Sequence, residues 1–261
     1  MNNGELTALL NLLKVPSLGP TRIRTLVQAL GSPEKVLSAS KPELCQVDGI
    51  NMAIAREVNN YSPNNFAEVQ LERADEYGVK IISIWDDEFP PLLKRIYDPP
   101  VVIFFNGELQ EEDADTVAIV GTRTPTSYGK QVAEELSREL AGAGMTIVSG
   151  FAKGIDTIAH LAALEAGGRT IAVLGNGLDV VYPAENRSYL PLFDENAVFI
   201  SEFPFGTKPD APNFPQRNRI ISGLSHGVIV VEAGSSSGAV LTALDSVDQN
   251  REVFAVPGRL T

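Results

Sequence analysis

The sequence predicts an α/β protein with a Rossmann-like fold, a mostly parallel sheet with helices on both faces, preceded by a small all-helical N-terminal domain. From Val117 onward, short apolar runs alternate with amphipathic stretches, as expected for strands and helices that follow one another in such a sheet. The N-terminal part instead repeats leucines at helical spacing, at Leu6, Leu9, Leu10 and Leu13. Glycine-rich turns follow several predicted strands, where ligands bind in sheets of this type.

Composition and charge narrow the functional classes. The 261 residues carry a formal net charge of −12, so a nucleic-acid role would need a local basic groove rather than bulk attraction. The single cysteine, Cys45, excludes an internal disulfide framework and fits a cytoplasmic protein. With two histidines, His160 and His226, a Cys/His zinc site is not expected, and we expect no metal or cofactor. The sequence has neither an apolar run long enough to cross a membrane nor a signal peptide, so no membrane contact is expected.

Residues 1–62 are predicted to form a helical module. Two apolar turns that contain glycine, at 15–20 and 47–51, each precede a predicted helix. The pair resembles tandem helix-hairpin-helix units, whose turns often dock on a DNA backbone. A SAM-like helical module that binds protein is the alternative.

Residues 63–261 are assigned to the second domain. Its first part is predicted to hold a helix over 63–77 and strands over 79–84 and 101–105. Proline pairs between these strands predict extended backbone without helix, and the acidic run at 111–115 predicts a solvated loop.

The remaining chain alternates between the two element types. Strands are predicted over 117–120, 146–149, 170–174, 197–201, 227–231 and 252–256. Helices are predicted over 127–142, 154–166, 184–195, 218–224 and 238–249. Several glycine-rich loops therefore converge on the carboxyl edge of the sheet.

Two of these loops predict a polyanion site. The turn Gly121-Thr122-Arg123 follows one strand, and the turn at 149–156, which contains Gly150 and Lys153, follows the next. A glycine-rich turn before a helix leaves backbone N–H groups unpaired and presents the positive end of the helix dipole, which suits phosphate.

A set of motifs in order resembles the DNA-processing protein A family, also called DprA or Smf. They are Gly121-Thr122-Arg123, 149–156, Tyr182-Pro183, 214–224 and 254–258. The resemblance implies a Rossmann-like domain that binds single-stranded DNA, dimerises, and loads the recombinase RecA during natural transformation. It also implies a binding protein and not an enzyme, so no catalytic residue is assigned.

The residues expected to bind DNA combine glycines, cations and one aromatic ring. They are Gly121, Thr122, Arg123, Gly150, Lys153, Lys208, Phe214, Arg217, Asn218 and Arg219. Bases would stack on the phenylalanine while the cations, about four of them, would contact phosphates. Arg123 and Arg217 are expected to be held out toward solvent, and salt bridges to acidic neighbours are the alternative for Arg217 and Arg219. Asp156 is expected to cap its helix or to interact with the helix dipole, and His160 to be a hydrogen-bonded core histidine.

The stretch from Phe203 to Phe214 is rich in proline and glycine, and predicts a long ordered loop beside the ligand edge. The family usually places a lysine three residues before this second phenylalanine, where this chain has Ala211. Lys208 could take that role if the loop folds back.

Three further features leave alternatives open. The loop at 232–238 leaves open a second function, a nucleotide-cleaving enzyme of the lysine-decarboxylase-like Rossmann group, although this chain has Glu-Ala-Gly where that group has Pro-Gly-Gly. The helix over 238–249 carries an apolar stripe, either a homodimer face in the C-terminal part of the Rossmann-like domain or a face packed on the sheet; its residues are Val240, Leu241, Leu244 and Val247. The family pattern normally continues beyond 257–261, so this chain is expected to be a truncated or incompletely ordered form, and any C-terminal winged-helix domain would lie outside it.

Overall fold

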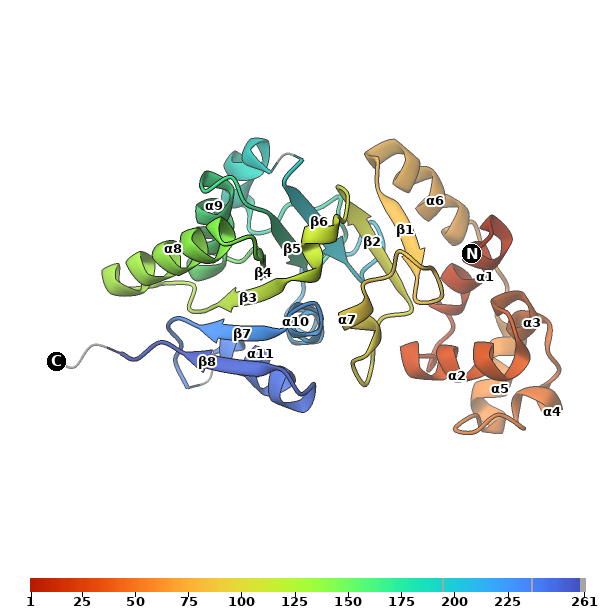
Figure 1. Ribbon diagram of the computed structural model, residues 1–261. Coiled ribbons are helices and arrows are strands. Elements are labelled where there is room, and N and C mark those ends of the chain that lie inside the picture. The colour runs from red at the N-terminus through yellow and green to blue at the C-terminus, as the bar shows by residue number, and fades with distance from the viewer. Residues whose placement is uncertain (194, 236, 259–261) are drawn as a thin grey trace. The chain divides into compact units, whose positions relative to one another are not determined.

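The computed structural model describes residues 1–193, 195–235 and 237–258, and the chain divides into two compact units (Figure 1). Unit 1 comprises Met1–Phe89 with Asp98–Ile103, and unit 2 comprises Pro90–Tyr97 with Phe104–Thr261. The boundary expected near residue 62 falls inside unit 1, and it stays a prediction about which part folds independently.

Unit 1 is helical apart from a short strand pairing. Its elements are α1 (Asn3–Leu12), α2 (Pro20–Leu30), α3 (Pro33–Ser38), α4 (Lys41–Leu44), α5 (Met52–Asn60), α6 (Phe66–Tyr77), β1 (Lys80–Ser83) and the start of β2 (Val102–Asn106). Leu9 and Leu10 are fully buried, as the helical spacing predicts. Asn51, in the second turn, caps α5 by accepting a hydrogen bond from the Ile54 N–H at 3.0 Å.

Unit 2 contains the predicted sheet. Its later strands are β3 (Thr116–Val120), β4 (Thr146–Ser149), β5 (Thr170–Leu174), β6 (Ala197–Ser201), β7 (Gly227–Val230) and β8 (Glu252–Ala255). The strand order is β2-β6-β5-β4-β3-β7-β8, and the pairs from β6 to β8 are parallel, while β2 runs antiparallel to β6. The mostly parallel sheet is confirmed. The order reverses at β3, which lies between β4 and β7.

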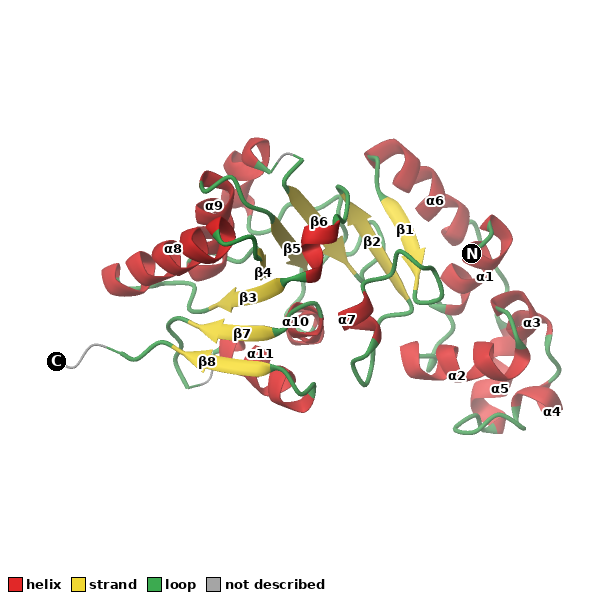
Figure 2. Cartoon of the chain, viewed as in Figure 1, coloured by secondary structure: helices red, strands yellow, loops and turns green. Residues whose placement is uncertain are grey.

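Helices cover both faces of this sheet (Figure 2). They are α7 (Pro91–Lys94), α8 (Ser127–Gly142), α9 (Ile155–Glu165), α10 (Asn213–Gly223) and α11 (Gly238–Asp248), with 3₁₀ segments η1 (Glu111–Ala114) and η2 (Ala184–Leu192). Because side chains alternate along a strand, Val117 and Ile119 pack with α8 and α9, whereas Val120 faces α10 and α11.

Four sequence predictions in this unit are wrong, each for a local reason. Pro91 begins α7 although the prolines predicted no helix, because the first helical residue needs no N–H partner. The acidic run at 111–115 is mostly exposed, as predicted, but it forms η1 instead of an irregular loop, and Asp113 stabilises this turn by accepting from the Gln110 N–H at 2.8 Å. The segment at 184–195 is 3₁₀ and contains Pro191. Helix α10 begins at Asn213 and not at 218. Pro215 lies in the first turn, where backbone N–H groups have no partner within the helix, so its missing N–H does not prevent the helix from starting earlier.

Two structural findings concern functional classes. No helix among the described residues is long and apolar enough to cross a membrane. In the same part of the chain, no cluster of three His, Cys, Asp or Glu side chains is arranged to hold a metal ion.

His160 is a core residue, as expected. It is fully buried on α9, and its Nδ1 lies 2.6 Å from the hydroxyl of Thr170 on β5. Its ring packs against Phe151 and Phe193, with centroids 6.0 and 5.6 Å away. Burial, with a smaller contribution from the positive charge of Arg217, lowers the pKa of His160 to about 3. The imidazole is therefore neutral in the folded protein.

This burial predicts a pH effect on stability. The pKa of His160 is lower in the folded state than in the unfolded chain, where it is about 6.5. The unfolded state therefore takes up the proton first, and stability falls as pH drops from about 6.5 toward 3. We expect this residue to contribute a slope of about 1 kcal/mol per pH unit, measured by urea unfolding between pH 7 and 5.

The matched variant is His160→Gln, which keeps a polar group near Thr170 but does not titrate. Its free energy of unfolding should change less with pH than that of the parent over the same window. Parallel pH profiles for the two proteins would contradict the assignment.

Candidate functional site

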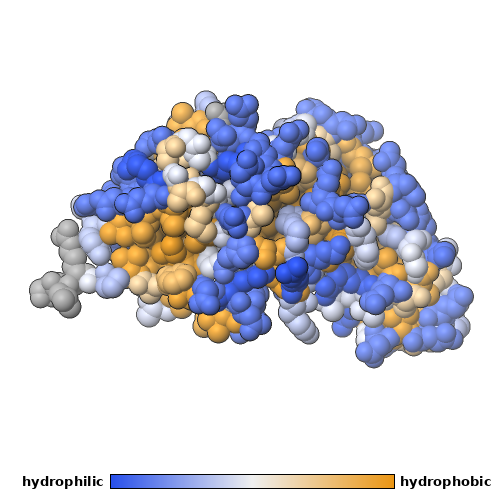
Figure 3. All heavy atoms as spheres, viewed as in Figure 1, coloured by the Kyte–Doolittle hydropathy of each residue, from blue (hydrophilic) through white to orange (hydrophobic). Residues whose placement is uncertain are grey.

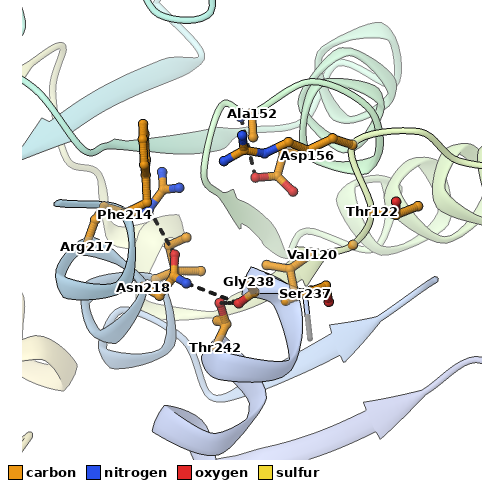
Figure 4. Close-up of a pocket in the computed structure, with 14 residues that line it drawn as sticks. Val120, Thr122, Ala152, Asp156, Phe214, Arg217, Asn218, Ser237, Gly238 and Thr242 are labelled. Carbon is orange, nitrogen blue, oxygen red and sulfur yellow. Dashed lines mark hydrogen bonds between the residues drawn. The ribbon is translucent and has the colours of Figure 1, made fainter. Parts of the chain in front are cut away.

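A cavity of about 330 Å³ opens where the strand order reverses, at the carboxyl ends of β3 and β7 (Figure 4). This is where open α/β sheets bind ligands, because the loops leaving the two strands diverge there. Five segments line it, namely the end of β3 with the loop that follows, the loop after β4, the first turn of α9, the first turns of α10 and the start of α11. Segments distant in sequence thus meet at one point.

The loop after β3 is held in place by its own backbone. The Thr122 N–H donates to the carbonyl oxygen of Glu232 at 2.6 Å, and the Thr122 carbonyl accepts from the Ile155 N–H at 3.2 Å. Gly154 has a φ of 82° and lies against this carbonyl, where a Cβ atom would collide. The loop is therefore fixed against the start of α9.

The loop after β4 corrects the expectation of unpaired N–H groups. The carboxylate of Asp156 accepts from the backbone N–H groups of Gly150 at 3.1 Å and Ala152 at 3.4 Å. The Thr157 N–H bonds to the carbonyl of Ala152, at 3.2 Å. Asp156 thus organises the loop that precedes α9 instead of capping the helix.

Arg217 is buried, which contradicts the expectation that it faces solvent. Only 4% of the residue is exposed, and its guanidinium donates to the carbonyls of Gly150, at 2.5 Å, and Val173. Its Nε donates to the Asn218 side chain at 3.2 Å (Figure 4). Burial lowers the pKa of Arg217 to about 10, an effect that the negative charge of Asp156 opposes. Burial likewise raises the pKa of Asp156, against the attraction of Arg217.

Close packing around this guanidinium requires a glycine at position 150. A Cβ atom on Gly150 would lie 2.6 Å from Asp156 Oδ2 and 2.7 Å from the Arg217 guanidinium. Gly150 therefore supports the floor of the cavity, although it was predicted as a DNA contact.

Arg123 is the exposed cation of the cavity. Its guanidinium carbon lies 5.5 Å from the centroid of the Phe214 ring. The ring of Tyr182 also lies near Phe214, with the two centroids 5.6 Å apart and the ring planes inclined by 31°. A cation and a second aromatic ring thus both lie next to Phe214, and we call these three residues the Arg123–Phe214–Tyr182 row. Tyr182 was part of a quoted motif but had no predicted role, because no spacing rule places it near Phe214.

The remaining predicted residues separate into two groups. Gly121, Thr122 and Asn218 line the cavity with the residues above, and the Asn218 amide donates to the Gly238 carbonyl at 3.1 Å. Lys153, Lys208 and Arg219 are not among the residues that line this cavity in the described chain.

The three residues of the second group lie outside the cavity, and each has different neighbours. Arg219 is paired with Glu202, with its guanidinium 2.6 and 2.7 Å from the two carboxylate oxygens, which is the salt-bridge alternative. Lys153 is paired with Glu185. Lys208 is exposed, and its carbonyl accepts from the Asn213 side chain at 3.3 Å.

The start of α11 adds polar groups that the predicted DNA contacts did not include. Ser237, Gly238 and Thr242 line the cavity (Figure 4). The hydroxyl of Ser237 is buried and has no hydrogen-bond partner among the described residues. A buried hydroxyl without a partner at a helix N-terminus can accept from or donate to a ligand. The glycines and serines at 232–238 were the available signal, but they were assigned to the enzyme alternative.

Glu232 has a structural role. Its carboxylate accepts from the Thr126 N–H at 3.0 Å and from the Thr126 hydroxyl at 3.1 Å, next to the start of α8. It is not among the described residues that line the cavity. This arrangement gives no support to a catalytic role for Glu232.

The fold and the cavity define a Rossmann-like protein with a cationic, aromatic-walled pocket at the switch point of its sheet. The family model for DNA recombination-mediator protein A matches residues 80–261, and the chain belongs to this family. The DNA processing protein DprA of Bacillus subtilis is 47% identical over 209 residues, covering 80% of this chain and 70% of its own. The motifs that resembled this family at the level of sequence are thereby confirmed.

Two solved structures extend the comparison. DprA from Streptococcus pneumoniae is 34% identical and has a TM-score of 0.83, covering 100% of this chain and 88% of its own. DprA from Helicobacter pylori, which has a single-stranded DNA binding mode, is 33% identical with a TM-score of 0.64, covering 70% and 83%. The chain spans between 57% and 70% of the length of the curated relatives it matches first.

The two cavity arginines predict contrasting effects on stability. Arg217→Ala should lower the free energy of unfolding by about 3–5 kcal/mol, because it leaves Asp156 buried without its cationic neighbour. Arg123→Ala, the matched control, should change it by less than about 1 kcal/mol, because Arg123 is exposed. Urea unfolding of the purified variants measures both values. Equal stabilities would show that the Arg217 network contributes nothing to the fold.

Proposed function

We propose that this protein binds single-stranded DNA in the cavity at the carboxyl ends of β3 and β7 and acts as a recombination mediator. The observation that carries the proposal is the Arg123–Phe214–Tyr182 row at the cavity. Membership of the recombination-mediator family and the DNA binding of the Helicobacter pylori relative support it.

The row fits the chemistry of a single strand. Aromatic rings stack on unpaired bases of any sequence, and a neighbouring guanidinium takes the phosphate between them. In a duplex, the bases are already paired and stacked, so Phe214 and Tyr182 would have no free base face to contact. The net charge of −12 also disfavours coating of duplex DNA by bulk attraction.

The residues of the site are proposed to act on the strand in different ways, some by direct contact and others by holding the cavity in shape. Arg123 is the phosphate ligand of the cavity, and Lys153 contacts the strand outside it. Arg217 and Asn218 act by holding the floor and the α11 terminus, while Gly121 and Thr122 bring the strand close to the backbone. Ser237 offers an additional hydrogen bond. Arg219, because it is paired with Glu202, supports α10 rather than the strand.

We further propose the finer role that the family implies. The protein would load the recombinase RecA on single strands during natural transformation, in the cytoplasm, without catalysing a reaction. The acidic remainder of the chain offers a surface to a protein partner. The DNA pocket is small and local, so most of the surface stays available when a strand is bound.

Dimerisation is proposed through α11 and β8, the C-terminal part of unit 2. Three of the four residues of the apolar stripe of α11 do not pack on the sheet, since Leu241, Leu244 and Val247 are 43%, 57% and 61% exposed. On the edge strand β8, Val253 and Phe254 are 37% and 56% exposed. Figure 3 shows hydrophobic residues gathered on the surface at the β7–β8 end of unit 2. An apolar face beside an open strand edge is typical of a protein interface.

Binding should prefer single strands and weaken with salt. Fluorescence anisotropy should show at least tenfold tighter binding of oligothymidine than of a duplex of equal length. With Arg123 and Lys153 as the phosphate ligands, the log–log salt slope should be roughly −1 to −2, because each contact on a single strand contributes about −0.7. Phe214→Ala should weaken binding by about 1–3 kcal/mol, the range for loss of one stacked base.

The same preparation is assayed for hydrolysis of mononucleotides and for RecA filament growth on strands coated with single-strand-binding protein. Faster filament growth without hydrolysis is the expected result. Equal affinity for duplex DNA would contradict the pocket, and turnover of a nucleotide would favour the enzyme alternative.

The dimer proposal predicts that Leu244→Glu produces a monomer. A carboxylate in the centre of the apolar face would have to be desolvated on association, which opposes the dimer. Analytical ultracentrifugation at micromolar concentration should show a dimer for the parent and a monomer for this variant. Met52→Glu, which places the same charge at an exposed apolar residue of unit 1, is the control and should stay dimeric. A monomeric parent would refute the dimer.

A further inference from the structure

A second hollow of about 530 Å³ lies next to the first cavity, and Arg123 lines both. Its wall combines the loop after Arg123, the first turn of α8, the start of α9 and η2. The lining residues that bear on ligand binding are Arg123, Lys130, Lys153, Leu161, Glu185 and Tyr189. We call this hollow the α8–η2 groove.

Positive charge is concentrated in this groove. Three of its lining residues, Arg123, Lys130 and Lys153, are cationic and one, Glu185, is anionic. This excess occurs in a protein whose formal net charge is −12. An anion that approaches the carboxyl edge of the sheet therefore meets a local excess of positive charge in this groove.

The one carboxylate does not close the groove to an anion. Glu185 is paired with Lys153, and both side chains are well exposed, at 64% and 51%. The hydrogen bond from Lys153 lowers the pKa of Glu185, so the carboxylate is charged at neutral pH. Because an exposed ion pair contributes little to stability, a phosphate can replace Glu185 as the partner of Lys153 at small cost.

The walls of the groove are fixed before any ligand arrives. The Asn186 amide donates to the Phe151 carbonyl at 2.9 Å and to the Thr157 hydroxyl at 3.0 Å, which ties η2 to the loop after β4. The Thr157 hydroxyl in turn donates to the Ala152 carbonyl at 2.6 Å. Half-buried Tyr189 and Leu161 supply an apolar surface for a base or sugar.

We infer that the α8–η2 groove binds the nucleotide that flanks the one in the first cavity. The strand then crosses over Arg123, whose guanidinium takes the phosphate between the two nucleotides, while Lys130 and Lys153 take the next phosphate. Tyr189 receives the base. The inference rests on the proposed binding of single-stranded DNA. It adds Lys130, Tyr189 and Glu185 to the residues that determine the affinity for the strand.

The test compares short and longer strands on matched variants. Affinities for oligothymidines of three and eight nucleotides are measured for the parent, Lys130→Ala and Arg138→Ala. Arg138 lies on the same helix, outside both cavities, and is exposed beside Glu134 and Glu165, so its loss changes the net charge equally. Circular dichroism checks that all variants are folded.

Lys130→Ala should weaken binding of the eight-nucleotide strand about fivefold and reduce its salt slope by about 0.7, the contribution of one phosphate contact. Binding of the three-nucleotide strand should change less than about twofold, and Arg138→Ala should change neither strand by more than that. Glu185→Gln, which removes the competing carboxylate, should tighten binding of the longer strand about twofold at low salt.

The outcomes separate the inference from the proposed function. If the parent binds both strands but Lys130→Ala and Glu185→Gln bind the longer one as the parent does, the groove is not a subsite and the first cavity stands. If Lys130→Ala and Arg138→Ala weaken the longer strand equally, the effect is one of net charge and the inference fails. A parent that binds neither strand refutes the proposed function and the inference with it.

Discussion

The buried charge of Arg217 is the interaction on which the rest of the site depends. Its guanidinium joins the carbonyl of Gly150 at the end of β4, the carbonyl of Val173 on β5, and Asn218 on its own helix. Asp156, held by two N–H groups of the same loop, provides the opposing charge. A buried arginine costs much desolvation, which is offset only when its donors are satisfied, so α10 and the loop after β4 are fixed together.

This arrangement separates charges that hold the fold from charges that can meet a ligand. The guanidinium groups of Arg217 and Arg219 are hydrogen-bonded within the protein, by carbonyls in one case and by Glu202 in the other. Arg123 remains exposed above Phe214, which Arg217 positions because both lie in the first turns of α10. Buried arginines of α10 thus hold in place the ring against which the exposed Arg123 lies.

Helix α10 also connects the cavity with the apolar face of α11. At the start of α11, the carbonyl of Gly238 accepts a hydrogen bond from the Asn218 amide. At the end of α11, the Gln249 side chain donates to the Arg219 carbonyl and accepts from the Ser222 hydroxyl. The inner side of α11, which includes Thr242 and Ser246, is buried against its neighbours. The proposed strand pocket and the proposed dimer face therefore belong to one hydrogen-bonded pair of helices, with opposite surfaces available for the two roles.

The sequence by itself determined the alternating sheet, its strand limits to within a residue or two, and the loops that converge at its carboxyl edge, because hydrophobic periodicity and glycine turns are local. It also identified Arg123 and Phe214. Only the tertiary structure decided that Arg217 is buried, that Arg219 is paired, and that Tyr182 stands beside Phe214. A guanidinium has the same local sequence signal whether it faces water or the carbonyl of a strand far away in the chain. Burial and partnership are properties of the packed sheet, and so they appear only when the segments meet.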